Sequence, residues 1–392
     1  MKNIDCEIVS SVDEKKLEII LISSVPPNPT SSGEIVLYRH LSQAPKYKIT
    51  VISESRKSSE NKVISRILNR LSNTRLHNWL NDMKVIACGK SWDDSLKSRY
   101  PCHQNTIVLT VAHGDGCWAA HRYARKHKLP LVTIFHDWWP DIPYVHTIFR
   151  DTLRDRFKKL YQDSDLALCV SEEMKIALGS HDNSQVLYPI PGENLNQFRY
   201  KKFLDKQSAP IRVMYCGNLY HYACEIAKLL KVTKDSSTVS LQVRGKNPNW
   251  QPSFRQEMSE RGLWLDFAPR EQLYEWLRSA DALLVVMSFD PKLRRRMETS
   301  FPSKLCEYAQ LGKPIIVWGP DYCSAAQWAR KGDWALCISK RNPNSVVATL
   351  EKLHKSSELR QYYAEKTREV AQNLFNPSSI QKQFLDAING LI

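Results

Sequence analysis

The feature of this sequence that most constrains its fold is a series of short, continuous apolar segments. In the first half of the chain they lie at residues 17–23, 47–53, 85–88, 106–112, 131–135 and 166–170. Segments with helical spacing, such as 34–41 and 172–178, lie between or after them. Strands that are apolar at every position are buried on both faces, which is typical of a parallel sheet covered by helices. We therefore expect an α/β fold with a doubly wound sheet.

The same pattern begins again after a break that is rich in proline, glycine and polar residues and ends at Pro210. Further strands are expected at 211–216, 239–244, 263–267, 282–287, 314–318 and 334–338, with helices at 271–278, 303–310 and from 343 onward. This predicts an N-terminal Rossmann-like domain at 1–195, a linker at 196–210, a second such domain at 211–370 and a C-terminal helix at 371–392. Because such sheets bind ligands at the carboxyl ends of their strands, two domains of this kind predict a cleft between them.

The composition is that of a globular protein, with 42% hydrophobic and 25% charged residues. The first twenty residues include Asp5, Glu7, Asp13 and Glu14, so we expect no signal peptide, and no apolar run is long enough to cross a bilayer. None of the ten cysteines has C-x-x-C spacing, which argues against a zinc site and favours a reduced cytoplasm. A net charge of +15 indicates an anionic partner.

The most informative motif is FPSKLCEYAQLGKPIIVWGP at residues 301–320. It predicts a helix that begins after Pro302, with Ser303 as its cap, and a buried strand after a glycine stop. Ser303, Lys304 and the first amides of the helix would form an anion site, and Glu307 lies one turn further on the same face, where a carboxylate can accept hydrogen bonds from ribose hydroxyls. Alternatively Ser303 only caps the helix and Glu307 pairs with a nearby Arg or Lys. The residues by themselves favour that second interpretation.

This motif resembles the donor site of the family 4 glycosyltransferases, which have the GT-B fold. The resemblance implies two Rossmann-like domains that face a cleft, with the last helix crossing back to the N-terminal domain. It also implies that Glu307 binds the donor ribose and that Ser303 and Lys304 approach the donor phosphates. The activity implied is transfer of a sugar from a nucleotide-sugar with retention of anomeric configuration. In such a reaction the departing phosphate takes the acceptor proton, so no protein base is required.

The sequence departs from the family before this motif. The family often has a second Glu, ahead of the one that matches Glu307, where this chain has Thr299 with Glu298 beside it. That carboxylate is therefore absent or displaced. The preceding loop carries three arginines, 294–296, which either pair with phosphate or form a solvated loop. Arg294 is the candidate among them for donor binding.

Two histidines follow predicted strands, His113 in TVAHGDG and His136 in LVTIFHDWWPDIP. If the strands are parallel, both loops open toward the same edge of the sheet. In the resembling family these positions lie near the reacting sugar and the acceptor, and we expect His113, His136 and Asp137 to be catalytic. Two other interpretations stay open: the histidines are capping or core residues, and Trp138 either stacks on a sugar ring or packs in the core.

A loop at 25–33 follows the first strand, where the family has a glycine-containing loop near phosphate and acceptor. Ser32 and Gly33 are the candidates here, although the usual pair of glycines reads Ser-Gly and a plain surface turn explains the loop equally well.

A second glycine position ends the first strand of the second domain, at Gly217 and Asn218. The family often places an Arg and a Lys just after this glycine to hold the diphosphate, and this chain does not. Arg244 or the arginines at 294–296 are expected to compensate, and Arg270 falls where the base-binding loop would lie.

No D-x-D motif follows any predicted strand, so we expect no metal and no cofactor apart from the nucleotide-sugar co-substrate. The phosphate charge would be balanced by a helix dipole and basic side chains. Other activities stay open: a sugar-nucleotide epimerase or hydrolase, an inactive GT-B scaffold, or a basic nucleic-acid-binding protein. The last is the weakest, because the chain has no RNP, KH or zinc motif.

Residues 56–84 combine basic and apolar side chains in a pattern typical of an amphipathic helix. Such a helix either lies on an anionic membrane or packs on its own domain with a solvated basic face, and the second is more usual in globular enzymes. Together with the charge, it leads us to expect a glycan or lipid-linked glycan acceptor of polysaccharide biosynthesis. The protein would then be cytoplasmic, with peripheral attachment at the inner face of the cell membrane.

Overall fold

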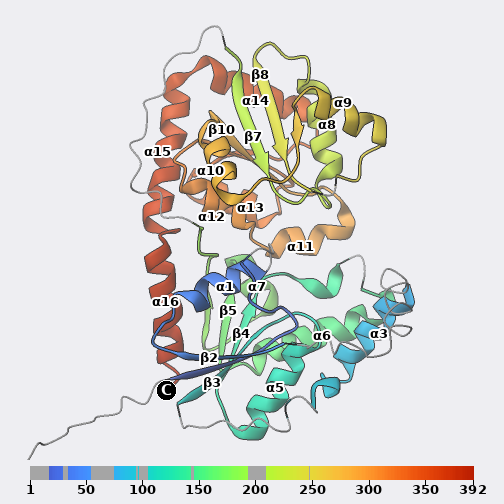
Figure 1. Ribbon diagram of the computed structural model, residues 1–392, viewed down its shortest axis with the longest axis vertical. Helices are drawn as coiled ribbons and strands as arrows, with labels where there is room; N and C mark the ends of the chain where they lie inside the picture. The colour runs from blue at the N-terminus through green and yellow to red at the C-terminus, as the bar shows by residue number, and fades with distance from the viewer. Residues whose placement is uncertain are drawn as a thin grey trace, which may run out of the picture.

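A computed structural model describes residues 17–29, 34–53, 75–93, 96, 105–142, 145–192, 209–246 and 248–392. In this part of the chain two six-stranded sheets form, one in each half of the sequence, and every strand pairing is parallel. Figure 1 shows them as two units along the long axis of the molecule, with the N-terminal unit below. The expected two-domain α/β architecture is confirmed.

The N-terminal sheet has the strand order β2-β1-β3-β4-β5-β6. Its strands are β1 (Glu18–Ile22), β2 (Lys48–Ile52), β3 (Thr106–Val111), β4 (Leu131–Phe135), β5 (Leu166–Cys169) and β6 (Ser184–Val186). Every residue of β1, β3, β4 and β5 is buried, whereas the edge strands β2 and β6 are partly exposed. The continuous apolar runs are therefore the strands that helices cover on both faces.

The helical elements of this domain are α1 (Glu34–Ser42), α3 (Arg75–Ile86), η1 (Lys90–Trp92), α5 (Gly116–His127), η2 (Trp139–Asp141), η3 (Thr147–Phe149), α6 (Arg150–Gln162) and α7 (Glu172–Leu178). The strand expected at 85–88 is wrong, because these residues end α3 and form the turn after it. The chain leaves the helix through Cys88 and Gly89, which both have positive φ. An apolar run of four residues does not distinguish a strand from the buried side of a helix.

The C-terminal sheet has the strand order β12-β11-β10-β7-β8-β9. Its strands are β7 (Ile211–Cys216), β8 (Val239–Arg244), β9 (Trp264–Leu265), β10 (Ala282–Val286), β11 (Ile315–Trp318) and β12 (Leu336–Ile338). Its helical elements are α8 (Ala223–Thr233), α9 (Pro252–Glu260), α10 (Arg270–Arg278), η4 (Pro291–Leu293), α11 (Arg294–Thr299), α12 (Ser303–Ala309), α13 (Ser324–Lys331) and α14 (Pro343–Lys355).

The last two helices, α15 (Ser357–Asn373) and α16 (Pro377–Asn389), run along one side of both domains (Figure 1). They are separated at Asn376, whose side chain caps α16 by accepting a hydrogen bond from Ser379 N at 3.1 Å. Phe384 of α16 is fully buried in the apolar cluster that also contains β1 and β3, and its ring centroid lies 4.6 Å from that of His40. The crossing of the last helix back to the N-terminal domain is thus confirmed.

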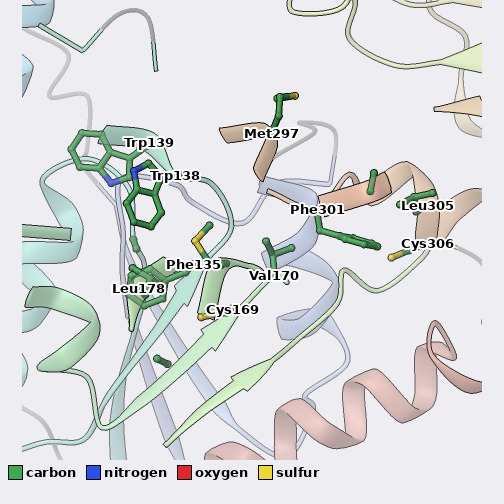
Figure 2. Packing of buried hydrophobic residues seen from close by; sticks show 14 of the residues in the cluster. Phe135, Trp138, Trp139, Cys169, Val170, Leu178, Met297, Phe301, Leu305 and Cys306 are labelled. Atoms are coloured by element: carbon green, nitrogen blue, oxygen red, sulfur yellow. The ribbon is translucent and has the colours of Figure 1, made fainter. Parts of the chain in front are cut away.

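An apolar cluster joins the two domains where the site lies. Figure 2 shows Val170, just after β5, beside Phe301 of the other domain, and Phe135 and Met297 belong to the same apolar cluster. Ser171 adds a hydrogen bond from its Oγ to the carbonyl of Thr299 at 2.6 Å. The carboxyl ends of β4 and β5 therefore face α11 and the start of α12.

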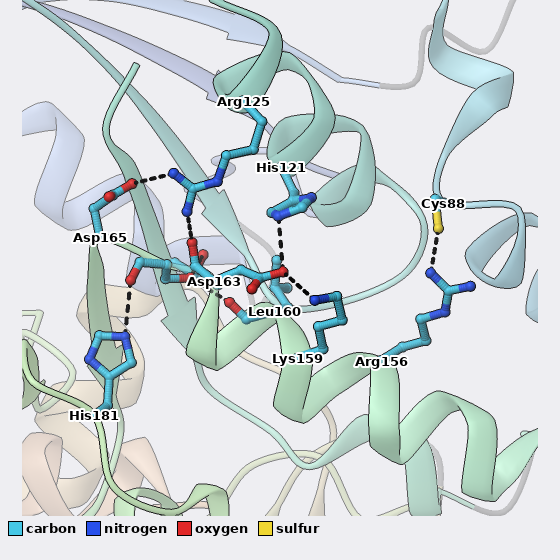
Figure 3. Close-up of polar contacts among 11 residues, drawn as sticks. Cys88, His121, Arg125, Arg156, Lys159, Leu160, Asp163, Asp165 and His181 are labelled. Atoms are coloured by element: carbon cyan, nitrogen blue, oxygen red, sulfur yellow. Dashed lines mark hydrogen bonds and ion pairs between the residues drawn. The ribbon is translucent and has the colours of Figure 1, made fainter. Parts of the chain in front are cut away.

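A network of ion pairs and hydrogen bonds lies at the opposite end of the N-terminal sheet (Figure 3). Asp163 interacts with His121 and Lys159, each at 3.2 Å, and Asp165 accepts a hydrogen bond from Leu131 N at 2.8 Å. These groups hold α5 and α6 against the amino ends of β4 and β5. Since ligands bind such sheets at the carboxyl ends, we assign this network to the scaffold.

Candidate active site

Helix α12 begins at Ser303, with Pro302 in the capping position and no side chain bonded to the first turn. The expectation that Ser303 caps this helix is therefore wrong, since Ser303 is its first residue. The amides of this turn are left without a side-chain partner. The feature that makes the helix start cationic is the next residue, Lys304.

Lys304 lies directly over Gly217 at the carboxyl end of β7. A Cβ atom at Gly217 would stand 2.3 Å from Cε and 2.7 Å from Nζ of Lys304, and Gly217 has a φ of 145°. A side chain at residue 217 would displace the end of Lys304 from this position, and the positive φ also favours glycine. The ammonium lies 5.4 Å from the ring centroid of Tyr215 and 5.7 Å from that of Tyr222, and burial lowers its pKa. No described residue forms an ion pair with Lys304.

Arg296 of α11 connects the two domains across this position. Its guanidinium donates to both oxygens of Asp137, at 3.3 and 3.2 Å, and lies 2.9 Å from Nε2 of His221. Burial acts to raise the pKa of Asp137, but the charge of Arg296 together with the hydrogen bonds from Ser300 and Arg296 outweighs burial and holds the pKa below its usual value. Asp137 is therefore an ionised carboxylate, and it partly balances Arg296 but not Lys304.

His113 follows β3 and His136 follows β4, so both lie at the carboxyl edge of the N-terminal sheet. Burial lowers the pKa of both rings, that of His136 to about 4, and the nearby Asp137 acts in the opposite direction on each. Both histidines are therefore neutral near pH 7. His113 also lines a hollow of about 270 Å³ in the N-terminal domain, together with Ser24, Asp82 and other residues.

Glu307 binds residues of both domains. Its Oε1 accepts from Arg39 of α1 at 2.5 Å, and its Oε2 accepts from Gly192 N at 3.0 Å and from the hydroxyl of Tyr274. Arg39 also donates to the carbonyl of Ile190 at 2.6 Å. The alternative in which Glu307 pairs with an arginine is therefore what the structure shows, and its ribose contact stays a prediction.

Comparison with known proteins identifies this arrangement. Residues 37–189 match the family described as Glycosyltransferase Family 4, and no curated protein matches the chain by sequence. The structure of HepE from Anabaena superposes with a TM-score of 0.64 at 12% identity, covering 95% of this chain and 100% of HepE. Sucrose-phosphate synthase from Thermosynechococcus elongatus superposes with a TM-score of 0.62 at 14% identity, covering 96% of this chain and 99% of that protein. The lipopolysaccharide outer core galactosyltransferase WaaB superposes with a TM-score of 0.59 at 16% identity, covering 96% of this chain and 100% of WaaB.

The chain has the GT-B fold. Its resemblance to the family 4 glycosyltransferases is confirmed by the match of the N-terminal domain and by these structures. In the GT-B frame, Lys304, Arg296 and Gly217 belong to the C-terminal side of the cleft. His113, His136 and Asp137 belong to the N-terminal side, so the structure brings together residues from four of the motifs that the sequence singles out.

The described contacts of Arg294 are with residues of its own domain. Arg294 donates to Glu298 at 2.8 Å and stacks on Tyr322, 4.4 Å from the ring centroid, while Glu298 also binds Arg295. Arg296, two residues later, points to a different side because a helix turns about 100° per residue. Donor binding by Arg294 therefore stays a prediction, and Arg296 is the arginine of this run that binds Asp137 of the N-terminal domain.

Trp138 packs in the core, so its proposed stacking on a sugar ring is wrong. Only 1% of its surface is exposed, its Nε1 donates to Asp141 at 2.7 Å, and Arg295 lies 4.5 Å above the ring. The apolar contacts with Phe157 and the strands below leave no free face for a carbohydrate.

The remaining predicted residues lie around the cleft or outside the described part of the chain. Asn218 accepts from Tyr220 N at 3.0 Å, and Arg244 donates to the carbonyl of Asp266 at 2.9 Å, so neither side chain contacts Lys304. Arg270 donates to the carbonyl of Gly192, beside Glu307. Ser32 and Gly33 lie outside the described residues.

Sequence reasoning missed Arg39, Tyr274 and His221. Arg39 and Glu307 are 268 positions apart and nothing in either local sequence indicates that they meet. His221 follows the Gly217 turn, so the strand-end rule that selected Gly217 and Asn218 also applies to it.

In the described ranges, no group of three or more His, Cys, Asp or Glu residues is placed to hold a metal ion. No helix of the described chain is long and apolar enough to cross a membrane.

Proposed function

We propose that this GT-B protein is a retaining glycosyltransferase that moves a sugar from a nucleotide-sugar to a glycan or lipid-linked glycan. The observation that carries the proposal is Lys304, a partly buried lysine without an ion pair in the described chain, which lies near the charge of Arg296, the residue that binds Asp137 of the other domain. HepE has been crystallised with UDP and with UDP-glucose, and WaaB is a galactosyltransferase, which supports a UDP-sugar as donor.

In this proposal the donor diphosphate lies at the carboxyl end of β7, against the ammonium of Lys304, which is held over Gly217. Lys304 and Arg296 stabilise the negative charge that grows on the leaving phosphate as the bond to the anomeric carbon breaks. Glu307 accepts hydrogen bonds from the ribose hydroxyls. Its contact with Arg39 must then be shared or exchanged when the nucleotide binds.

The acceptor hydroxyl would approach from the N-terminal side. His113 and His136 are neutral, so each can donate one hydrogen bond and accept another from sugar hydroxyls. Asp137 is tied to Arg296 and orients the surrounding groups instead of taking a proton. The acceptor oxygen forms the new glycosidic bond as the bond between the anomeric carbon and the phosphate oxygen breaks. The acceptor proton passes to that phosphate oxygen, so no protein base is required.

We also propose that the reaction needs no metal ion or other cofactor. The cations of Lys304 and Arg296 stand where a metal would otherwise neutralise the diphosphate. Activity should therefore be retained in EDTA. A complete loss that Mg²⁺ or Mn²⁺ restores would contradict this part of the proposal.

The acceptor is proposed to be presented at a membrane, on the evidence of helix α3. Leu76, Trp79, Leu80 and Met83 follow each other at helical spacing and are 52%, 37%, 44% and 37% exposed. Ile148 is 72% exposed. It precedes Phe149, whose ring contacts the ring of Trp79. An exposed apolar stripe beside basic residues is typical of a helix that lies on an anionic bilayer. Of the amphipathic stretch 56–84, residues 56–74 lie outside the described chain.

The donor is tested by a thermal-shift panel of UDP, GDP, ADP and their sugars, because a ligand that binds the folded state raises Tm. We expect UDP to stabilise the protein. Lys304→Met should weaken UDP binding roughly tenfold or more and leave uridine binding unchanged, since only UDP carries the diphosphate. Product analysis with and without acceptor then separates transfer from hydrolysis or epimerisation. If no nucleotide shifts Tm, the proposed donor site fails.

A further inference from the structure

A groove of about 640 Å³ lies between the domains beside the proposed active site. Its N-terminal wall is α6 with η2 and its C-terminal wall is η4 with the first turn of α11. Arg295 lines it above the buried ring of Trp138, and these two residues are the chain neighbours of Arg296 and Asp137, which bridge the cleft. The groove and the cleft are therefore adjacent, separated by this ion pair.

The lining of the groove is strongly charged. Of its twelve described lining residues, six are Arg or Lys and four are Asp or Glu. Arg154 is neutralised by Asp141 and Asp151, and Glu298 is shared between two arginines. These pairs account for the acidic groups of the lining other than Asp155.

Three cations are left without an ion pair within the described ranges, Arg150 and Lys158 on the N-terminal wall and Lys292 on the other. Lys158 of α6 and Lys292 of η4 are exposed. The ammonium groups of Lys158 and Lys292 lie on opposite walls of one groove, where like charges repel. An anion bound between them would remove that repulsion and contact both domains at once.

We propose that this groove binds an anionic stretch of the acceptor glycan, made of sugar units that carry carboxylate or phosphate groups. The proposal rests on the proposed function, because the groove lies next to the cleft in which the acceptor hydroxyl reacts. Several features favour a carbohydrate over a continuous polyanion. The groove is recessed and of the size of small-molecule sites, and its carboxylates accept hydrogen bonds from hydroxyls while repelling an uninterrupted row of phosphates.

The cations of this groove are separate from those proposed for the donor. Lys304 lies over Gly217 at the end of β7, whereas Lys158 and Lys292 lie on α6 and η4. Nucleotide binding and glycan binding can therefore be changed independently. This separation makes the inference testable before either substrate is identified.

The test is isothermal titration calorimetry with two probes, a hexamer of galacturonic acid and the neutral hexamer maltohexaose. The groove variant is Lys158→Gln/Lys292→Gln. The matched control is Lys228→Gln/Lys352→Gln, which removes the same charge from exposed sites on α8 and α14. We expect the acidic hexamer to bind the wild type at low salt, and the groove variant to bind roughly tenfold more weakly or worse. The control variant should bind like the wild type, and maltohexaose should bind more weakly than the acidic hexamer.

The inference is overturned if the acidic hexamer does not bind at low salt, if both double variants lose affinity equally, or if maltohexaose binds as tightly. It is also overturned if vesicles of phosphatidylglycerol bind through the same two lysines, since the groove would then serve a lipid surface. UDP should bind all three proteins equally. If UDP binds none of them, the proposed function fails, and the glycan result still decides what the groove recognises.

Discussion

At the scale of single residues, Glu307 has two roles to separate. Its carboxylate joins the domains through Arg39 and Gly192, and it is also the proposed ligand of the donor ribose. A loss of nucleotide binding in a Glu307 variant would by itself not distinguish the two. A variant of Arg39 separates the two roles, because Arg39 takes part in the bridge and has no proposed contact with the nucleotide.

We expect Glu307→Ala to weaken UDP binding roughly tenfold or more and Arg39→Ala to change it little. Both variants should lose about 2 kcal/mol of stability, because each breaks a hydrogen-bonded charge pair that is mostly buried. Calorimetry with UDP and urea unfolding measure the two effects. If Arg39→Ala loses as much UDP affinity as Glu307→Ala, the bridge explains the result and the ribose assignment is wrong.

At the scale of elements, α16 should carry a large share of the stability of the N-terminal domain. Phe384 is fully buried against β1 and β3, so Phe384→Ala should cost about 3–5 kcal/mol through lost burial and the cavity it leaves. Lys382→Ala on the same helix is the control, because that side chain is 79% exposed and should change stability by less than about 0.5 kcal/mol. Urea unfolding checks both. Equal, small effects would mean that α16 is only loosely attached.

The elements that the sequence predicts well are those with one dominant signal. Continuous apolar runs predict the buried strands β1, β3, β4 and β5, and the Asn376-Pro377 pair predicts the break before α16. Strand β6, at Ser184–Val186, is short and partly exposed, so it carries no such signal. At residues 85–88 the sequence predicts a strand that does not form, since an apolar run also suits one side of a helix.

The site is predictable only where it follows from the ends of strands. That rule alone places His113, His136 and Gly217 at the cleft. It cannot choose between Arg294 and Arg296, because the choice depends on the rotation of α11 about its axis. Nor can it find the Arg296–Asp137 contact, which joins residues 159 positions apart on different domains.

At the scale of the whole molecule, two histidines that are neutral in the folded protein make stability depend on pH. Burial lowers the pKa of His40 to about 3 and that of His136 to about 4, whereas an unfolded histidine titrates near 6.5. Below about pH 6.5 the unfolded chain therefore binds protons that the folded chain refuses. Stability should fall as the pH falls through this range, by up to about 1.4 kcal/mol per pH unit for each histidine.

The check is urea unfolding of the wild type and of His40→Gln between pH 7.5 and about 5, above the range in which carboxylates dominate. His40 donates or accepts at Nδ1 with Gln381 across to α16, and the glutamine keeps a polar group there. The variant should show a shallower fall in stability with decreasing pH. An unchanged slope would show that His40 is not held neutral in the folded protein.

The last prediction concerns the position of the molecule at a membrane. The stripe of α3 exposes large apolar side chains to water, and the net charge is +15. Each basic residue near an anionic surface contributes about 1 kcal/mol, but the attraction fades within about 8 Å at physiological salt. Binding should therefore be reversible and require both the apolar stripe and anionic lipid. We expect the wild type to co-sediment with phosphatidylglycerol vesicles at low salt and to be released by high salt.

Leu76→Ser/Leu80→Ser removes two exposed side chains of α3 and should abolish most of this binding without unfolding the protein, since neither residue is buried. Ile176→Ser/Val232→Ser is the matched control, because these apolar side chains are also exposed but lie on α7 and α8. It should bind vesicles like the wild type. If the two variants behave alike, or if the wild type ignores anionic vesicles at low salt, then α3 is not a membrane-binding helix. A soluble glycan would then be the preferred acceptor, because the groove lined by Lys158 and Lys292 does not depend on a bilayer.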